Sequence, residues 1–173
     1  IHVLPVGNAG NISAYWKGFV EYHQSGDAAS RPQMWGFQAA GAAPIVRGEV
    51  VTNPETVATA IRIGNPASWT LAENARDESG GRIDAVTDEQ ILDAQRDLGR
   101  HEGIFVDPSS APGLAGLLAA VAAGEAPKGQ TITITVTGHG LKDIDTPLSR
   151  IESVVDKVVD ADVHAAAEAA GLK

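Results

Sequence analysis

The sequence predicts an α/β domain whose sheet is mainly parallel. Short apolar or alternating runs recur along the chain, separated by stretches of helical period, an order typical of strands joined by crossover helices. Two of these runs end in glycine-rich turns, at residues 7–11 and 137–140. Because ligands of parallel sheets bind beyond the carboxyl ends of the strands, the two turns are expected to face one crevice.

The first part of the chain is expected to form two strands with a helix between them. Residues 1–6 and 34–38 are apolar runs and predict the strands. Apolar side chains recur at helical spacing from Asn11 to Gln24, and Gly26 is expected to end that helix. The small residues of 39–44 then suit close packing or the close approach of a flat ligand ring.

Two short helices are expected next, as an excursion between strands. Asn53 is a typical N-cap and Pro54 a typical first helical residue, which predicts a helix to about Arg62. A break at 64–66 is followed by a helical pattern over 68–78.

The second half repeats the alternation of strand and helix. A capping box formed by Thr87 and Gln90 predicts the start of a helix that ends near Gly103. Another helix is expected to begin at Pro108 and to include Val121. The expected strands are 82–86, 104–106 and 130–136, and an alanine-rich helix is expected at 161–170.

Composition narrows the classes of function. The 173 residues fit one domain, and the net charge of −9 without a basic run argues against nucleic acid or an anionic membrane as partner. The absence of cysteine excludes disulfides, cysteine-ligated zinc and thiol nucleophiles. No apolar run is long enough to span a membrane and no signal peptide opens the chain, so a cytoplasmic protein is expected. The first residue is Ile1 rather than methionine, which suggests a piece of a longer protein.

The turn at residues 7–11 joins a strand to a helix and predicts an anion site. Gly7 and Gly10 are expected to allow positive φ and close approach of a ligand. The exposed N–H groups and the positive end of the helix dipole would bind a phosphate. The turn matches neither the P-loop nor the dinucleotide pattern, and an ordinary turn between strand and helix fits this stretch equally well.

Five motifs, in order, closely resemble the C-terminal half of bacterial threonine synthase, a pyridoxal 5′-phosphate enzyme of fold-type II. They are P-V-G-N-A-G-N at 5–11, Q-A-A-G-A-A-P at 38–44, T-A-I-R-I-G-N-P-A-S-W at 59–69, E-G-I-F-V-D-P-S-S-A at 102–111 and T-G-H-G-L-K-D at 137–143. The resemblance implies that 1–143 form the C-terminal part of a three-layer, parallel-sheet cofactor-binding domain. Residues 144–173 would then be a C-terminal tail with a terminal helix.

The resemblance also implies site residues. Thr137 would hydrogen-bond the pyridine nitrogen, and as a neutral hydroxyl it would leave that nitrogen mostly unprotonated. Asn8 would also face the phosphate of the substrate, with Gln38, Gly41 and Ala42 near the substrate. The residues expected to bind the cofactor phosphate are Gly7, Asn8, Ala9, Gly10 and Asn11. No metal is expected, because the five histidines lack metal-ligand spacing.

The activity that the resemblance implies is conversion of O-phospho-L-homoserine and water to L-threonine and phosphate. The family's Schiff-base lysine belongs to an N-terminal motif that is absent here, and Lys142 matches no catalytic lysine of the family. No catalytic residue is therefore expected in this chain, and the isolated chain is expected to be inactive. The implied partners are the missing N-terminal half and a second copy in a homodimer.

Three alternatives remain open from the sequence. A threonine or serine dehydratase of the same fold would share the phosphate loop and differ in the substrate pocket. A non-catalytic domain that binds a phosphorylated ligand would explain the missing lysine. A hydrolase built on His101, Asp107 and Ser109 is weak, because no nucleophile-elbow pattern surrounds the serine.

Overall fold

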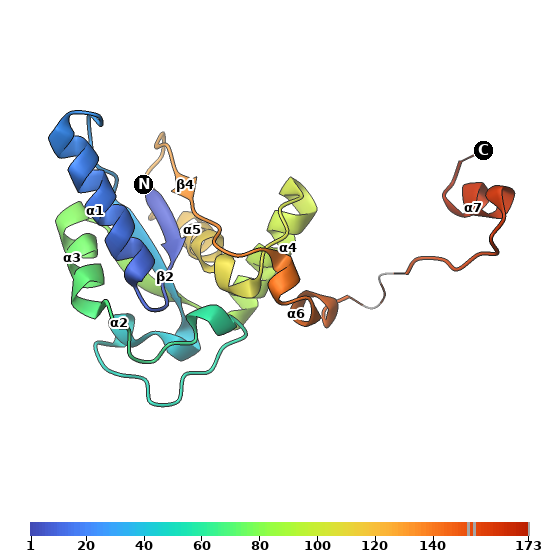
Figure 1. Ribbon diagram of the computed structural model, residues 1–173, viewed down its shortest axis with the longest axis horizontal. Helices are drawn as coiled ribbons and strands as arrows, with labels where there is room; N and C mark the ends of the chain where they lie inside the picture. Colours follow the sequence, from blue (N-terminus) through green and yellow to red (C-terminus); the bar gives the residue numbers. More distant parts are fainter. Residues whose placement is uncertain (152, 154, 173) are drawn as a thin grey trace.

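The chain folds around one four-stranded parallel sheet, seen in a computed structural model that describes residues 1–151, 153 and 155–172 (Figure 1). The strand order is β3-β2-β1-β4, and each neighbouring pair is parallel. The strands are β1 (His2–Pro5), β2 (Met34–Ala39), β3 (Arg82–Val86) and β4 (Thr133–Ile134). The predicted α/β class with a parallel sheet is confirmed.

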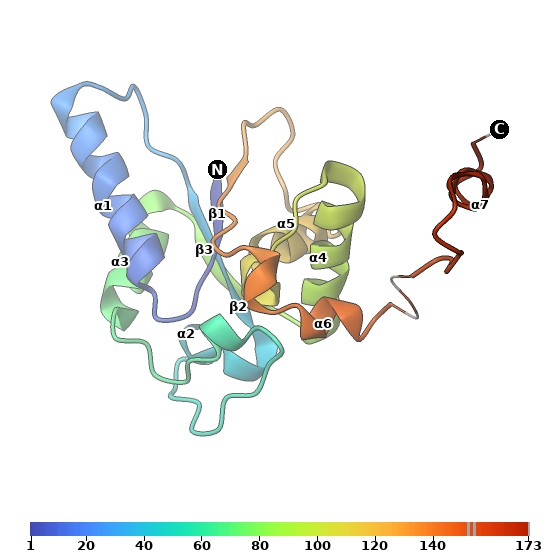
Figure 2. The same ribbon diagram turned by 45° about the vertical axis from the view of Figure 1, so that its right-hand side comes forward.

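Helices cover both faces of the sheet and complete three layers (Figure 2). Alternate strand residues point to opposite faces, so β1 sends Val3 to one helical layer and Leu4 to the other. One layer consists of α1 (Gly10–Ser25) and α3 (Trp69–Ser79), and the other of α4 (Asp88–Glu102) and α5 (Pro112–Ala122). Each helical layer buries its own apolar cluster against the sheet. This burial determines which side chains of each strand face which layer.

The strand register brings the carboxyl ends of the strands to one edge. Pro5 pairs with Phe37, and Val3 pairs with Ile134. The chain therefore leaves β1, β2 and β4 in the same direction, which places the segments 6–11, 40–44 and 135–140 along that edge. We call it the carboxyl edge.

The helix expected at 53–62 is wrong: only the single turn η2 (Thr59–Ile61) is helical there. The backbone groups of this segment bind partners distant in the chain instead. Glu55 N–H donates to Gly41 O at 3.1 Å, and Val57 N–H donates to Asp88 Oδ2 at 3.1 Å. In a helix capped by Asn53, Val57 N–H would be the first donor of an intrahelical hydrogen bond, and here that N–H donates to Asp88 instead.

The short strand expected at 104–106 is also wrong. Val106 forms a single antiparallel bridge with His139 and does not join the sheet. The strand expected at 130–136 is confirmed only over the two residues of β4, which pairs with β1. The helix expected from Pro108 begins instead with the turn η3 (Pro108–Ser110), and α5 follows from Pro112.

The remaining elements are short, and the C-terminal tail extends away from the sheet (Figure 1). Helix α7 (Val163–Ala169) follows an exposed stretch, lies within the predicted range 161–170 and contains no buried residue. Within the described residues, no helix combines the length and apolar character needed to cross a membrane. The other short elements are η1 (Ala40–Ala42), α2 (Pro44–Arg47), η4 (Gly140–Lys142), α6 (Asp145–Leu148) and α7 (Val163–Ala169).

Candidate cofactor site

The turn from β1 into α1 has the sharp geometry expected of a loop that binds a ligand with its backbone. The positive φ predicted for the glycines is wrong in position: Ala9 adopts it, with φ of 66°, and is buried. Gly7 is needed for close packing, because a Cβ there would lie 2.9 Å from Ile61 Cα. Gly10, by contrast, has no heavy atom within 4 Å of such a Cβ. The loop therefore packs against Ile61 at Gly7, whereas the space beside Gly10 is free of atoms from the described residues.

Several backbone N–H groups of this loop have no hydrogen-bond acceptor among the described residues. Within the described part of the chain, the N–H groups of residues 7–11 donate to no protein acceptor. The side chain of Asn11 closes the loop, since Nδ2 donates to Pro5 O at 2.7 Å and Oδ1 accepts from Ile12 N–H at 2.8 Å. The open N–H groups lie at the N-terminus of the 16-residue helix α1, where an anion is favoured. The loop therefore fits a phosphate group.

Asn8 connects the loop to the G-N-P-A-S-W segment. Its Oδ1 accepts from Ala67 N–H at 2.7 Å, and its carbonyl oxygen accepts from Ser68 N–H at 3.2 Å. The side chain is exposed. With Oδ1 engaged, Nδ2 is the end of this amide that can face a ligand.

Gln38, near the end of β2, has a side-chain amide whose N–H donors lie unpaired inside the described part of the protein. Its side chain is fully buried, and Oε1 accepts from Ile45 N–H at 3.0 Å and Val46 N–H at 3.3 Å, which caps α2. Nε2 has no hydrogen-bond partner among the described residues. Nearby in the sequence, Gly41 leaves no room for a Cβ beside Glu55 O, and Ala42 is fully enclosed by protein.

Thr137 lies in the loop that follows β4, and its side chain is exposed. A second segment clamps this loop: Gly140 N–H donates to Phe105 O at 3.0 Å, and Asp107 N–H donates to Gly138 O at 3.2 Å. The Thr137 hydroxyl contacts Ser110 Oγ at 2.9 Å. No role is predicted for Ser110 from the sequence, in which its only signal is its place in the D-P-S-S-A motif.

A continuous series of contacts joins the two loops along the carboxyl edge. Gly7 packs on Ile61, and the neighbouring Ala60 N–H donates to Ser109 Oγ at 3.0 Å. Ser110, the next residue, contacts Thr137. The structure thus brings the predicted phosphate loop and Thr137 to one edge of the sheet and connects them through residues of two further motifs.

A family comparison identifies the class of protein. Residues 1–138 match the family described as pyridoxal-phosphate dependent enzymes. The chain belongs to this family. Pyridoxal phosphate is thus the cofactor of the family, as predicted, and the open phosphate donors of the loop fit it.

Curated relatives of this pyridoxal-phosphate family member include threonine synthases. The chain is 56% identical over 161 residues to the threonine synthase of Mycobacterium leprae, covering 93% of this chain and 45% of that protein. It is 57% identical to that of Mycobacterium tuberculosis strain H37Rv, covering 92% and 44%, and 56% identical to that of Halalkalibacterium halodurans, covering 86% and 42%. The predicted resemblance is confirmed, and the chain spans about 45% of the length of the first of these relatives.

Solved structures of related fold support the assignment of the fold. A threonine deaminase from T.th. superimposes with a TM-score of 0.63 at 23% identity, over 80% of this chain and 48% of that one. Maize serine racemase does so with a TM-score of 0.62 at 22% identity, over 80% and 43%. At these identities the likeness concerns the fold, and it confirms the fold-type II architecture expected for the family.

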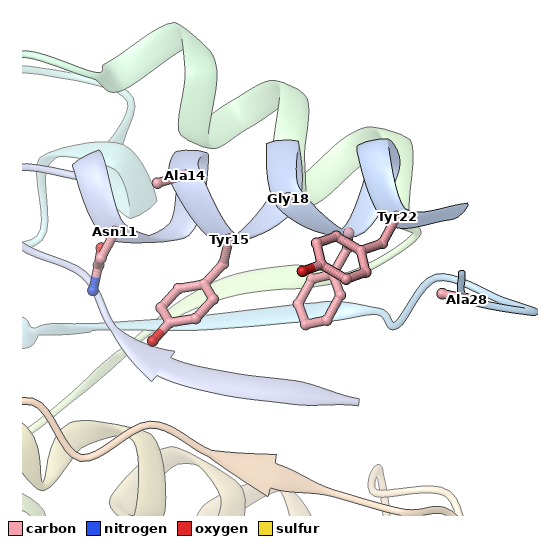
Figure 3. A pocket seen from close by; sticks show the side chains of 7 residues that line it. Asn11, Ala14, Tyr15, Gly18, Tyr22 and Ala28 are labelled. Carbon is pink, nitrogen blue, oxygen red and sulfur yellow. The ribbon is translucent and has the colours of Figure 1, made fainter. Parts of the chain in front are cut away.

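A groove of about 510 Å³ along α1 lies mostly outside the predicted site (Figure 3). Tyr15 and Tyr22 project from one side of α1 into it, and Asn11 is the one predicted site residue among its described lining residues. The groove is mainly apolar and presents few groups that could bind a phosphate. No group of three or more metal-ligating side chains occurs among residues 1–151, 153 and 155–172.

Proposed function

We propose that the protein to which this chain belongs is a threonine synthase, which converts O-phospho-L-homoserine and water to L-threonine and phosphate. The observation that carries the proposal is 56% identity to a threonine synthase across 93% of this chain. Identity to structures of threonine deaminase and serine racemase is 22–23%. The dehydratase alternative is therefore less well supported.

We assign the phosphate of the cofactor to Gly7, Asn8, Ala9, Gly10 and Asn11. The open N–H groups of this loop would bind the phosphate oxygens directly, and the α1 dipole adds to the attraction. Thr137, at the other end of the edge, would hydrogen-bond the pyridine nitrogen. When bound, pyridoxal phosphate supplies the electron sink for charge that develops on the substrate carbons.

The substrate is assigned to the region between these two loops. Asn8 Nδ2 is available to a substrate phosphate because Oδ1 is held by Ala67 N–H. Gln38 Nε2 is a buried donor whose open position favours a polar ligand group or the missing half of the protein. Gly41 and Ala42 would provide a close, small-residue wall near the substrate.

We further propose that the chain is the C-terminal half of the enzyme. Residues 1–143 would form part of the cofactor-binding domain and 144–173 a tail, of which 152, 154 and 173 lie outside the described residues. The lysines of the described part are exposed and none matches the family's Schiff-base lysine, so that lysine is expected in the preceding half. The complete protein is expected to be a homodimer in the cytoplasm, without nucleic acid or membrane as partner.

The activity is tested with the complete protein, loaded with pyridoxal phosphate. Phosphate release from O-phospho-L-homoserine, with threonine as the second product, is the expected result. Ammonia release from threonine without phosphate release would instead support the dehydratase. Binding of both compounds without turnover would support a non-catalytic phosphate-binding protein.

The isolated chain tests the assignment of the lysine. Incubation of residues 1–173 with pyridoxal phosphate, followed by borohydride reduction, is expected to give no stoichiometric pyridoxyl-lysine adduct by intact mass. The complete protein, treated in the same way, is expected to give one adduct per chain. A stoichiometric adduct on the isolated chain would contradict the assignment.

A further inference from the structure

The side chain of Ser110 is fully buried, and its hydroxyl group lies at the centre of a small polar cluster. We call it the Ser110 cluster; it consists of Asp107, Ser110, Thr137 and Gly138. Gly138 N–H donates to Ser110 Oγ at 2.6 Å. The same Oγ lies 2.9 Å from Thr137 Oγ1, 3.3 Å from Gly138 O and 3.4 Å from Asp107 Oδ1. The Ser110 hydroxyl therefore has three possible acceptors nearby but only one proton to donate.

The cluster leaves little freedom to the backbone beside Thr137. A Cβ on Gly138 would overlap Asp107 Oδ2 and would lie 3.3 Å from Ser110 Oγ. Asp107 N–H also donates to Gly138 O at 3.2 Å, so both sides of Gly138 are held. Thr137 is exposed, but its hydroxyl is anchored from behind by the buried Ser110.

The distances decide where the Ser110 proton goes. A serine hydroxyl can donate once and accept twice, and the bond from Gly138 N–H uses one acceptor position. An O–H···O bond is normally 2.5–3.0 Å long, so Thr137 Oγ1 at 2.9 Å is a good acceptor, whereas Gly138 O at 3.3 Å and Asp107 Oδ1 at 3.4 Å are poor ones. Donation from Ser110 to Thr137 is therefore favoured.

This direction sets what Thr137 offers to a ligand. If Thr137 Oγ1 accepts from Ser110, the Thr137 proton is left to donate outward, toward an acceptor. An unprotonated pyridine nitrogen is such an acceptor, whereas a protonated one would require Thr137 to accept. The polarity of the cluster thus matches a ring nitrogen without a proton.

We propose that Ser110 is a positioning residue that donates its proton to Thr137 Oγ1 and so directs the Thr137 hydroxyl proton toward the unprotonated ring nitrogen of the cofactor. The inference rests on the proposed function, because it takes the ring nitrogen as the partner of Thr137. Ser110 itself is enclosed and acts through Thr137.

The test measures the ring nitrogen directly, in the complete protein loaded with pyridoxal phosphate that carries ¹⁵N in the ring. Ser110→Ala is expected to move the ¹⁵N resonance toward the position of a pyridine nitrogen without a hydrogen bond, in the same direction as Thr137→Ala. Ser109→Ala is the matched control: Ser109 is also buried, and its Oγ accepts from Ala60 N–H at 3.0 Å. That variant is expected to leave the resonance unmoved.

A double variant separates positioning from a general structural role. If Ser110 acts through Thr137, the resonance of Ser110→Ala combined with Thr137→Ala coincides with that of Thr137→Ala alone. A further shift in the double variant would overturn the inference. Ser110→Cys keeps a side chain of similar size with a weaker donor, and its expected shift is intermediate; it replaces Ser110→Ala if that variant fails to fold.

Failure of the inference and failure of the proposed function give different results. A shift in Thr137→Ala with none in Ser110→Ala or Ser110→Cys would overturn the role of Ser110 alone. No shift in Thr137→Ala would overturn the assignment of Thr137 to the ring nitrogen, and the inference with it. The release of phosphate from O-phospho-L-homoserine by the unmodified protein tests the activity independently of both.

Discussion

At the scale of single residues, Gly7 sets how closely the turn at residues 7–11, the proposed phosphate loop, approaches the rest of the carboxyl edge. An added Cβ would lie 2.9 Å from Ile61 Cα and 3.1 Å from Ile61 Cβ, and backbone cannot easily move away. Gly7→Ala is therefore expected to lower the free energy of unfolding by about 1–3 kcal/mol, as overpacking in a core does. Denaturant titration measures the change.

Gly10→Ala is the matched control in the same loop, because nothing lies within 4 Å of its added Cβ. It is expected to leave the unfolding midpoint close to that of the parent protein. Equal destabilisation by both variants would mean that the loss in Gly7→Ala does not come from contact with Ile61.

The side chain of His2 connects β1 to β4 through hydrogen bonds, and we expect it to make the stability of the protein depend on pH. The ring lies between Thr133 Oγ1, 2.8 Å from Nδ1, and Thr135 Oγ1, 3.2 Å from Nε2. Burial lowers the pKa of His2 from its ordinary 6.5. Its contribution to stability is therefore complete above pH 6.5, and it is lost as the pH falls through the lowered pKa, because the unfolded chain binds the proton first.

The measurement is the free energy of unfolding between pH 7.5 and pH 5 (about the range of histidine titration). His2→Gln keeps hydrogen-bonding groups but does not titrate, so its stability is expected to fall less over this range than that of the parent. His101→Gln, at the exposed end of α4, serves as control. An unchanged slope in His2→Gln would contradict the prediction.

At the scale of elements, α5 approaches the sheet closely through small residues. Gly116 faces the ring of Phe37 on β2, and a Cβ at this position would overlap that ring. Gly116→Ala is expected to lower the free energy of unfolding by about 1–3 kcal/mol, despite the better helix propensity of alanine. Thermal or denaturant unfolding measures the loss.

Gly99→Ala on the exposed side of α4 is the control, because no atom lies within 4 Å of its added Cβ. Here propensity alone acts, and a gain of about 0.5–1 kcal/mol is expected. Stabilisation by both variants would show that α5 can move away from the sheet to accept the larger residue.

Local signals predicted elements well where no distant partner competed for the backbone. The capping box of α4 forms as expected, with Gln90 N–H donating to Thr87 Oγ1 at 3.2 Å and Thr87 N–H donating to Gln90 Oε1 at 2.8 Å. The capping signal at Asn53 fails, because Asp88 accepts a hydrogen bond from Val57 N–H, which a helix starting there would use internally. The difference between the two is tertiary.

At the scale of the whole molecule, the C-terminal tail contributes unequally. Arg150 Nη2 lies 3.4 Å from Asp93 Oδ1 and connects the end of α6 to α4, whereas α7 has no buried residue. If the complete protein is truncated after Ile151, its free energy of unfolding is therefore expected to stay within about 0.5 kcal/mol of the full-length value. A protein that ends at Asp143 is expected to lose about 1 kcal/mol, since α6 is removed as well.

Unfolding curves of the two truncated proteins, compared with the full-length protein at equal concentration, measure these changes. A large loss on removal of the residues after Ile151 would show that this part of the tail packs on another part of the complete enzyme. Equal stability of both truncations would show that α6 does not stabilise the sheet domain.

Local sequence patterns were enough to predict the fold class, the positions of most helices and the glycine-rich turn after β1. These features depend on hydrophobic period, capping residues and glycine-rich turns, all of which act over a few neighbouring residues. The resemblance in five motifs identified the family before any geometry was known. The roles within each motif did not follow from it.

How the five motifs come together depends on contacts between distant parts of the chain. The parallel register of β1 with β4 brings loops that are about 130 positions apart in the chain to one edge. The tertiary structure also revealed that Ala9, rather than a glycine, takes the positive φ, and that Ser110 stands behind Thr137. Contacts between distant segments carry no local sequence signal, because they depend on how strands pair and layers pack, so folding alone establishes them.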